Sequence, residues 1–448
     1  MKSLFKGMLM ATTLSLVLTA CGGATPAPTA APAAKPTDAP KATEAPKATD
    51  APKPTVAPTA APKPTDAPKP TEAPKAGGSM QIPDIEKGKF NVAMVLLGPH
   101  DDGGWSQAHF EGLQYMDKNV PNIHTAYIES VPDTADSEQV FRSLARKGFD
   151  LIFGTSFGYM DPMANVAEEF PTQMFIHLTG YKTNNKNFGN LMGAMEDMKY
   201  LGGMLAGARM KKDGQTKAGY MATFPIPEEL RLGNAFALGM RKTCPTCTMD
   251  VRWINTWHDP VVEKDAASSL FDAGAYVVFT GADTPAAGDV ATEKKKFGLN
   301  YDWSGNCVKS GCLTTMYWNW GPIYAQIAKD TVAKTYKPGF QYFEADSGSL
   351  GLFGFMEGQK PQPGVADLPE ADVKMIKDTL AQMLAGKFTR FDVFKGPIKD
   401  NKGKVVLADG AKMEPADIDC FAVGDKPTCK IGMYWWAEGV NAELPKLQ

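Results

Sequence analysis

The sequence has few histidines and no excess of either charge. Its 448 residues include 5 histidines, 47 basic and 50 acidic residues, and the formal net charge is −3. Such a chain lacks the basic surface that attracts nucleic acid, so we expect no nucleic-acid partner. The HExxH and G-x-x-x-x-G-K-[ST] motifs are also missing, and we expect neither a metal nor a cofactor. After the first 20 residues, no apolar run is long enough to cross a membrane.

Large apolar side chains are missing from residues 24–78. This segment has no Leu, Ile, Phe, Tyr or Trp, and it holds 14 of the 34 prolines. It therefore cannot bury enough apolar surface to offset the entropy of folding. Proline favours an extended polyproline II conformation, at about 3.1 Å per residue. We predict a disordered, semi-rigid tether over residues 21–88.

The segment before the tether has the features of an export signal. Lys2 and Lys6 precede an apolar stretch, Met8–Leu18, that is too short to span a bilayer. Leu18-Thr19-Ala20 then leads to Cys21, as in a bacterial lipobox. We expect removal of residues 1–20 and lipidation of Cys21, which would hold the chain at the membrane. The alternative is an ordinary secretory signal with a chance cysteine.

The six other cysteines form three close pairs in the sequence. Six cysteines allow fifteen connectivities, but local pairing is the simplest in an oxidising compartment. The first pair also has the C-x-x-C spacing of a redox motif or half a zinc site. It follows a predicted helix and precedes a strand, whereas a redox motif belongs at a strand-to-helix turn. We therefore predict three structural disulfides: Cys244–Cys247, Cys307–Cys312 and Cys420–Cys429.

From residue 89 onward, short β-rich apolar runs alternate with helical patterns. The first series has strands at 90–98, 124–131, 149–156 and 173–180, and helices at 107–119, 135–147 and 162–170. After a helical stretch at 195–212, the second has strands at 217–224, 249–257 and 275–282, and helices at 227–242 and 260–273. This alternation predicts two α/β lobes with parallel sheets. Ligands bind such sheets at the carboxyl ends of their strands.

Aromatic residues lie where several predicted strands end. Trp105 follows the first strand, Trp257 and Asp283 follow strands of the second lobe, and Trp318 and Trp320 lie in "LTTMYWNWGPIY". Any one of these tryptophans could simply pack in a core. Several of them at the strand ends of both lobes favour a cleft for a flat, hydrogen-bonding ligand, such as a nucleobase.

The motifs at these strand ends resemble a known family. "DDGGWSQAHFEGL", "PIPEELRLGNAFALG", "NTWHDP" and "LTTMYWNWGPIY" are similar to motifs of the basic membrane protein family of ABC-transporter substrate-binding lipoproteins, which includes purine nucleoside receptors. The resemblance implies a type I periplasmic-binding-protein fold with two Rossmann-like lobes, a hinge and a ligand cleft. We expect lobe 1 at about 89–210 plus 313–340, and lobe 2 at about 211–312 plus 341–448.

The resemblance also implies ligand-binding residues. The family holds a purine between two aromatic rings, and these positions fall on Trp105 and Trp257. A pocket glycine falls on Asp283, and an acidic residue that reads the base falls near Thr179. From the chemistry of a carboxylate rather than from the resemblance, we expect Asp283 to accept hydrogen bonds from an exocyclic amine and a ring N–H.

Two positions depart from the family pattern. A sugar-gripping aspartate falls on Asn300, and a sugar-gripping lysine falls on Trp318. Loss of this charged grip favours a bare, adenine-like base over a nucleoside, although a nucleoside remains the alternative.

A hydrolase is a competing interpretation of "GTSFG" at residues 154–158. The motif matches the G-x-S-x-G nucleophile elbow, so Ser156 could be a nucleophile. In that fold a histidine must follow the acid, but His258 is the last histidine and precedes Asp259 and Asp283. We expect instead that Ser156 and Phe157 line the cleft of a protein that is not an enzyme.

Together these patterns predict a lipid-anchored, extracytoplasmic solute-binding component of an ABC importer. Its partners would be a small-molecule ligand, a permease with its ATPase, and the membrane. A sensor or interaction lipoprotein is the alternative, because capture for transport and for signalling uses the same cleft. From about residue 340 the sequence predicts only a hairpin, in "GPIKDNKGKVVL", and completion of the second lobe.

Overall fold

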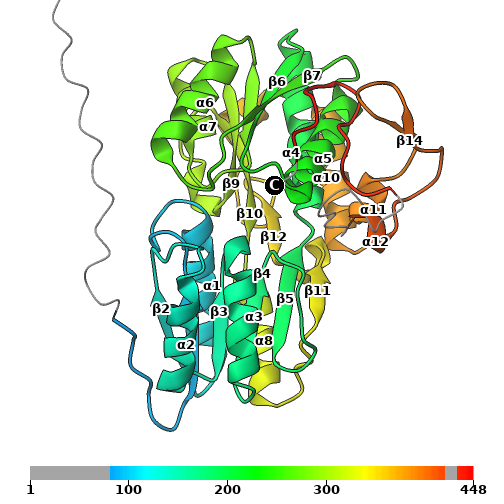
Figure 1. Cartoon of the computed structure of the whole chain (residues 1–448). Helices are drawn as coiled ribbons and strands as arrows, with labels where there is room; N and C mark the ends of the chain where they lie inside the picture. Colours follow the sequence, from blue (N-terminus) through cyan, green and yellow to red (C-terminus); the bar gives the residue numbers. More distant parts are fainter. Residues whose placement is uncertain (1–80, 419–430, 447–448) are drawn as a thin grey trace, which may run out of the picture. The chain divides into compact units, whose positions relative to one another are not determined.

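The computed structural model describes residues 81–418 and 431–446. Two large sheets, each flanked by helices, and one two-stranded sheet occur in this part of the chain (Figure 1). The predicted signal peptide, Cys21, the tether up to residue 80 and the Cys420/Cys429 pair lie outside the described residues.

The first sheet has six strands in the order β11-β5-β4-β3-β1-β2, and all neighbours are parallel. Its strands are β1 (Phe90–Val95), β2 (Ile123–Ile128), β3 (Leu151–Gly154), β4 (Met174–Leu178), β5 (Phe188–Gly193) and β11 (Phe340–Phe343). Successive residues of β1 face opposite sides: Val92 and Met94 join the core formed with α1 and α8, while Ala93 and Val95 join the core formed with α2 and α3. Helices on both faces explain why the strand is an unbroken apolar run.

The second sheet has the order β12-β10-β9-β8-β6-β7-β15. Its strands are β6 (Lys217–Ala222), β7 (Thr248–Trp253), β8 (Val277–Thr280), β9 (Phe297–Asp302), β10 (Cys312–Trp318), β12 (Leu350–Leu352) and β15 (Val440–Asn441). Tyr220 and Phe279 join the core that contains α4 and α5, whereas Met221 and Val278 face α6 and α7. Only the β10–β12 pairing is antiparallel within this sheet as described.

The helices lie against both faces of the two sheets (Figure 1). The four-residue or longer α-helices of the described residues are α1 (Trp105–Asn119), α2 (Ser137–Lys147), α3 (Met160–Glu169), α4 (Met195–Lys212), α5 (Pro227–Thr243), α6 (Pro260–Asp272), α7 (Ala286–Glu293), α8 (Gly321–Val332), α9 (Pro363–Ala366), α10 (Glu370–Leu384), α11 (Arg390–Val393) and α12 (Pro415–Ile418). Over residues 81–418 and 431–446, none of them has the length and apolarity that a bilayer crossing requires.

The chain passes between the sheets three times: after β5, after β10 and after β11. The sheet membership differs from the expected lobe boundaries in two places. Strand β10 lies in a segment that we predict for lobe 1, but it pairs with β9 and β12 of the second sheet. Strand β11 lies at the start of a segment that we predict for lobe 2, but it pairs with β5 of the first sheet. A run of apolar residues predicts a strand, but it does not show which of the two sheets that strand joins.

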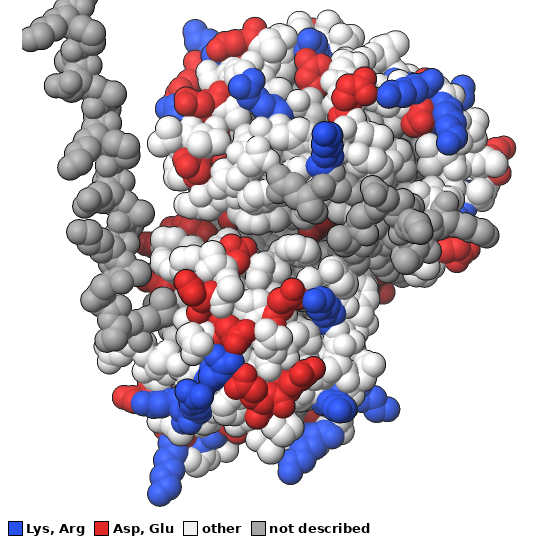
Figure 2. Space-filling view, viewed as in Figure 1, with Lys and Arg blue, Asp and Glu red and all other residues white. Residues whose placement is uncertain are grey.

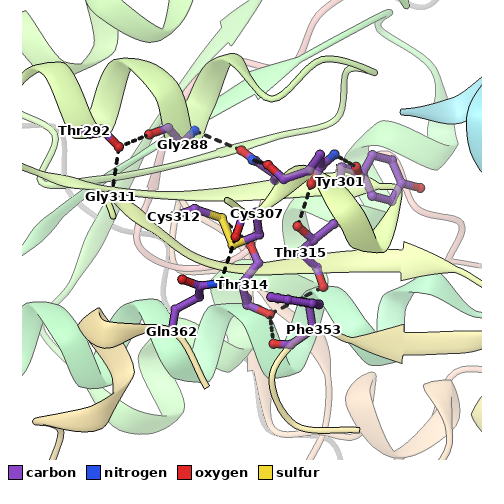
Figure 3. Close-up of a disulfide and its surroundings, with 12 residues drawn as sticks. Gly288, Thr292, Tyr301, Cys307, Gly311, Cys312, Thr314, Thr315, Phe353 and Gln362 are labelled. Atoms are coloured by element: carbon purple, nitrogen blue, oxygen red, sulfur yellow. Dashed lines mark hydrogen bonds between the residues drawn. A yellow bond between two sulfur atoms is a disulfide. The ribbon is translucent and has the colours of Figure 1, made fainter. Parts of the chain in front are cut away.

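Two of the predicted disulfides are present. Cys244–Cys247 follows α5 and precedes β7, and Cys307–Cys312 closes the loop between β9 and β10 (Figure 3). The predicted hairpin is also present, with β13 (Ile398–Lys399) antiparallel to β14 (Val405–Leu407).

Candidate functional site

A cavity lies where the carboxyl ends of strands from both sheets meet. Four aromatic rings and several acidic side chains line it. Its lining residues are Leu97, Trp105, Ser156, Phe157, Thr179, Glu228, Glu229, Trp257, Gly281, Asp283, Tyr301 and Asp302. Six of the eight predicted ligand-binding residues are therefore brought together here, from segments spread over almost 180 residues.

Trp105 is fixed by the start of α1. Asp102 accepts backbone N–H groups through both carboxylate oxygens, at 2.9 Å from Gly104 and Ser106 and 3.0 Å from Gln107. This side-chain capping satisfies the free N–H groups of a helix start. The Trp105 indole Nε1 donates to the Thr155 carbonyl at 2.6 Å. The ring is therefore held firmly at the cavity wall.

Ser156, Phe157 and Thr179 enter from the ends of β3 and β4. The Ser156 hydroxyl donates to Asp133 at 2.7 Å, and His177 Nε2 contacts the Ser156 carbonyl rather than its hydroxyl. Burial lowers the pKa of His177 to about 4. No histidine is in position to activate Ser156 among the described residues, so the geometry offers no support for a hydrolase.

Trp257 and Asp283 enter from loops after β7 and β8 of the second sheet. These loops are tied together, because the Asp283 N–H donates to the Trp257 carbonyl at 3.1 Å. Buried Glu263 fastens the Asp283 loop by accepting from both the backbone N–H and the hydroxyl of Thr284. The Trp257 ring also packs against Phe224, with centroids 5.1 Å apart.

Three acidic residues of the lining were not predicted: Glu228, Glu229 and Asp302. The two glutamates begin α5 directly after β6, and Asp302 ends β9, so each lies at a strand's carboxyl end. The same strand-end rule that selected Trp257 would have found them. In the sequence, "PEEL" instead has the ordinary look of an acidic first turn of a helix, which complements the helix dipole.

The predicted residues Asn300 and Trp318 do not line the cavity. Asn300 is buried, where it accepts from the Gly288 N–H and donates to the Asn306 carbonyl. Trp318 lies behind the wall, and its indole Nε1 donates to Asp302 at 2.9 Å. Trp318 thus supports Asp302 of the lining, whereas Asn300 holds backbone groups outside it.

Burial and mutual repulsion make the carboxyl groups of the site weak acids. Burial, followed by repulsion from other acids, raises the pKa of Asp283 well above its usual range. Burial likewise raises the pKa of Asp302 strongly and that of Glu228 to about 7. Burial lowers the pKa of Lys199, behind the cavity, to about 7. Perturbed groups gathered in one cavity are typical of functional sites.

The two lobes touch beside the cavity. The Asn306 amide donates to the Gly103 carbonyl at 3.1 Å, and the Trp303 indole donates to Glu111 at 2.8 Å. Both bonds join the loop after β9 to residues at or near α1. Figure 2 shows acidic side chains, in red, in the recess between the lobes. Elsewhere on this face acidic and basic residues intermingle.

Donor atoms of Asp102, His258 and Asp283 lie within 4.8 Å of one another, as a metal site would require. Both oxygens of Asp102 already accept N–H groups of α1. This commitment makes the trio a poor match for a resident metal ion.

Comparison with known proteins identifies relatives along most of this part of the chain. The family model for PnrA-like ABC transporter substrate-binding proteins (Bmp) matches residues 89–360. A purine-binding protein of Brucella abortus is 32% identical over 361 residues, which cover 80% of this chain and 95% of that protein. A Haloferax volcanii protein, whose provisional name is ABC transporter glucose-binding protein, is 40% identical over 235 residues, or 52% of this chain and 59% of that one.

Solved structures share the fold. A solute-binding protein of an ABC transporter system from Aeropyrum pernix has a TM-score of 0.58 at 16% identity, covering 69% of this chain and 93% of that one. A second, from Conexibacter woesei, has a TM-score of 0.52 at 20% identity, covering 66% and 97%. The predicted type I periplasmic-binding-protein fold is confirmed by these likenesses.

Proposed function

Because the chain belongs to the PnrA-like (Bmp) family of ABC transporter substrate-binding proteins, which are not enzymes, we propose that its cavity binds a purine base for import. The observation that carries this proposal is the pair of tryptophans. Trp105 comes from the first lobe and Trp257 from the second, and both line one cavity. Stacking on an aromatic side chain contributes about 1–3 kcal/mol per base. A flat ring between the two indoles would therefore link the lobes.

We propose a bare base, with adenine as the reference ligand, rather than a nucleoside. The positions that would grip a sugar with charged groups are Asn300 and Trp318, and both side chains are engaged behind the cavity wall. A ribose would thus gain little there. A sugar alone is a second candidate, since the Haloferax relative bears a glucose-binding name and carboxylates beside indole rings also suit a sugar.

The mechanism proposed is closure of the two lobes on the ligand. A ligand that contacts both lobes stabilises the closed form by its differential affinity for that form. The closed form would then be recognised by a permease with its ATPase. The interlobe bonds of Trp303 and Asn306 support such a closed arrangement.

We further propose that the chain acts outside the cytoplasm and is anchored through acylated Cys21. The lipobox-like sequence before Cys21 supports this. Intact-mass analysis of membrane-extracted protein tests it: a mature chain that starts elsewhere, or that carries no lipid mass, refutes the anchor.

A thermal-shift panel tests the ligand class. The full chain is heated with adenine, adenosine or D-glucose at matched concentrations. We expect the largest rise in melting temperature with adenine, because ligands that bind only the folded state stabilise it. A larger rise with adenosine would favour the nucleoside, and a rise with glucose alone would overturn the purine assignment.

A further inference from the structure

On the premise that the cavity binds a purine, we propose that Glu228 selects amino-substituted purines over oxopurines. Carboxyl groups are the most numerous polar side chains of the lining, from Glu228, Glu229, Asp283 and Asp302; the others are the hydroxyls of Ser156, Thr179 and Tyr301 and the indole N–H groups of Trp105 and Trp257. No Lys, Arg, His, Asn or Gln is among the described residues that form the lining. The wall is therefore rich in hydrogen-bond acceptors.

One of the acids is already satisfied within the protein. The Glu229 carboxylate accepts from the Tyr220 hydroxyl and from the Thr223 N–H, each at 2.8 Å. These bonds hold Glu229 in place and occupy its Oε2 atom. Its role is therefore to shape the wall beside Gly281, against which its carboxylate packs.

The other acids keep capacity for a ligand. Asp302 is fully buried; its Oδ1 accepts from the Trp318 indole, but its Oδ2 has no partner with hydrogen-bond geometry in the described chain. No described residue donates a hydrogen bond to the Glu228 carboxylate, although Glu228 lines the cavity. A buried acceptor without a donor is costly, so a ligand that supplies a donor to Asp302 Oδ2 is favoured.

Lys199 does not neutralise this wall from within the cavity. Its ammonium group is buried behind the lining, donates to the Thr280 carbonyl at 2.9 Å and lies 3.3 Å from the Tyr301 ring centroid. Its charge favours ionisation of Glu228, Glu229 and Asp302, but its N–H groups do not reach the ligand. Since no described residue donates to Glu228, a donor that faces its carboxylate must come from the ligand.

This chemistry distinguishes two purines of nearly equal shape. Adenine carries an amino group at C6, which donates, whereas hypoxanthine carries a carbonyl there, which only accepts. A carbonyl that faces the ionised Glu228 carboxylate leaves both groups unpaired and repelled. Unsubstituted purine, with hydrogen at C6, is the neutral reference.

Calorimetric titration of the full chain with these three purines tests the inference. At pH 8, above the pKa of about 7 for Glu228, we expect adenine to bind at least tenfold more tightly than hypoxanthine, with purine between them. In Glu228→Gln the amide NH₂ can donate to the carbonyl, so the adenine-to-hypoxanthine affinity ratio should fall at least tenfold. Glu370→Gln, at an exposed position that begins α10, is the matched control and should leave the ratio unchanged.

Two results would overturn the inference while the proposed function stands. These are equal affinities of the wild-type chain for adenine and hypoxanthine, or an unchanged ratio in a folded Glu228→Gln protein. If that variant does not fold, Glu228→Ala serves in its place, because loss of the carboxylate should likewise lower the adenine-to-hypoxanthine ratio. Failure of all three purines to bind the wild-type chain would refute the proposed function itself.

Discussion

Gly104 and Asp283 meet backbone to backbone beside the cavity, across the boundary between the two lobes. A Cβ atom added to Gly104 would lie 1.7 Å from the Asp283 carbonyl oxygen. Since the obstructing atom is backbone, it cannot move away by a change of rotamer. Any larger residue at position 104 must therefore hold the lobes apart.

Gly104→Ala should impair closure. We expect ligand affinity to fall more than tenfold, because the added methyl group clashes only in the closed arrangement. Small-angle X-ray scattering should show no decrease in radius of gyration on ligand addition. Gly339→Ala is the control, since its new Cβ would approach nothing closer than 3.8 Å. An unchanged affinity in Gly104→Ala would show that this contact is absent from the bound state.

The two stacking tryptophans should differ in their effect on stability. Trp257→Ala and Trp105→Ala should each weaken adenine binding by more than tenfold. Trp105 also packs edge-on against Trp318 and Trp320 and donates to Thr155, so only its loss should lower the melting temperature markedly. Calorimetry and thermal unfolding separate the two effects. The corresponding Phe variants should retain most of the affinity. Wild-type affinity for adenine in both Ala variants would rule out stacking.

The ligand-free protein should lose stability as the pH rises from 5 to 7. Burial raises the pKa of Glu228 from 4.5 to about 7, so its contribution to stability is complete below pH 4.5 and is lost as the pH passes 7. Burial also raises the pKa of Glu263 to about 7. Buried His109 and His177 act in the opposite sense up to pH 6.5, because burial lowers the pKa of both, but the acids with raised pKa outnumber them. The lowered pKa of Lys199 makes stability rise with pH only between pH 7 and its ordinary pKa of 10.5.

Glu228→Gln should flatten this pH dependence in part. The variant has no charge to bury at position 228. At pH 7 the absence of this cost should raise the free energy of unfolding by about 1–3 kcal/mol. Denaturant unfolding at pH 5 and pH 7 measures the difference. A slope as steep in the variant as in the wild type would mean that Glu228 is solvated in the folded protein.

The Cys307–Cys312 disulfide should support lobe closure. Its Cys307 directly follows Asn306, whose amide donates to the Gly103 carbonyl of the other lobe. Replacing both cysteines by serine should cost about 2 kcal/mol of stability on the loop-entropy account and weaken ligand binding. The matched control is the Cys244–Cys247 pair between α5 and β7, whose replacement should spare binding. Equal effects on affinity would contradict the proposed role of the loop.

The sequence predicted most of the sheet architecture because buried parallel strands leave unbroken apolar runs. It also predicted six cavity residues, since strand ends converge at one edge of a sheet. It missed Glu228 and Glu229 because two acids at a helix start have an ordinary structural explanation. It placed Asn300 by resemblance, and Trp318 by resemblance and by its position near a strand end. Neither signal can tell whether a side chain faces the cavity or the core behind it.

A crystal structure of the chain with adenine tests the central claim most directly. We predict that the purine ring lies between the Trp105 and Trp257 indoles, with its amino group directed at the carboxyls of Glu228, Asp283 and Asp302. Adenine bound elsewhere on the protein, or bound in the cavity without contact to both tryptophans, would contradict the account.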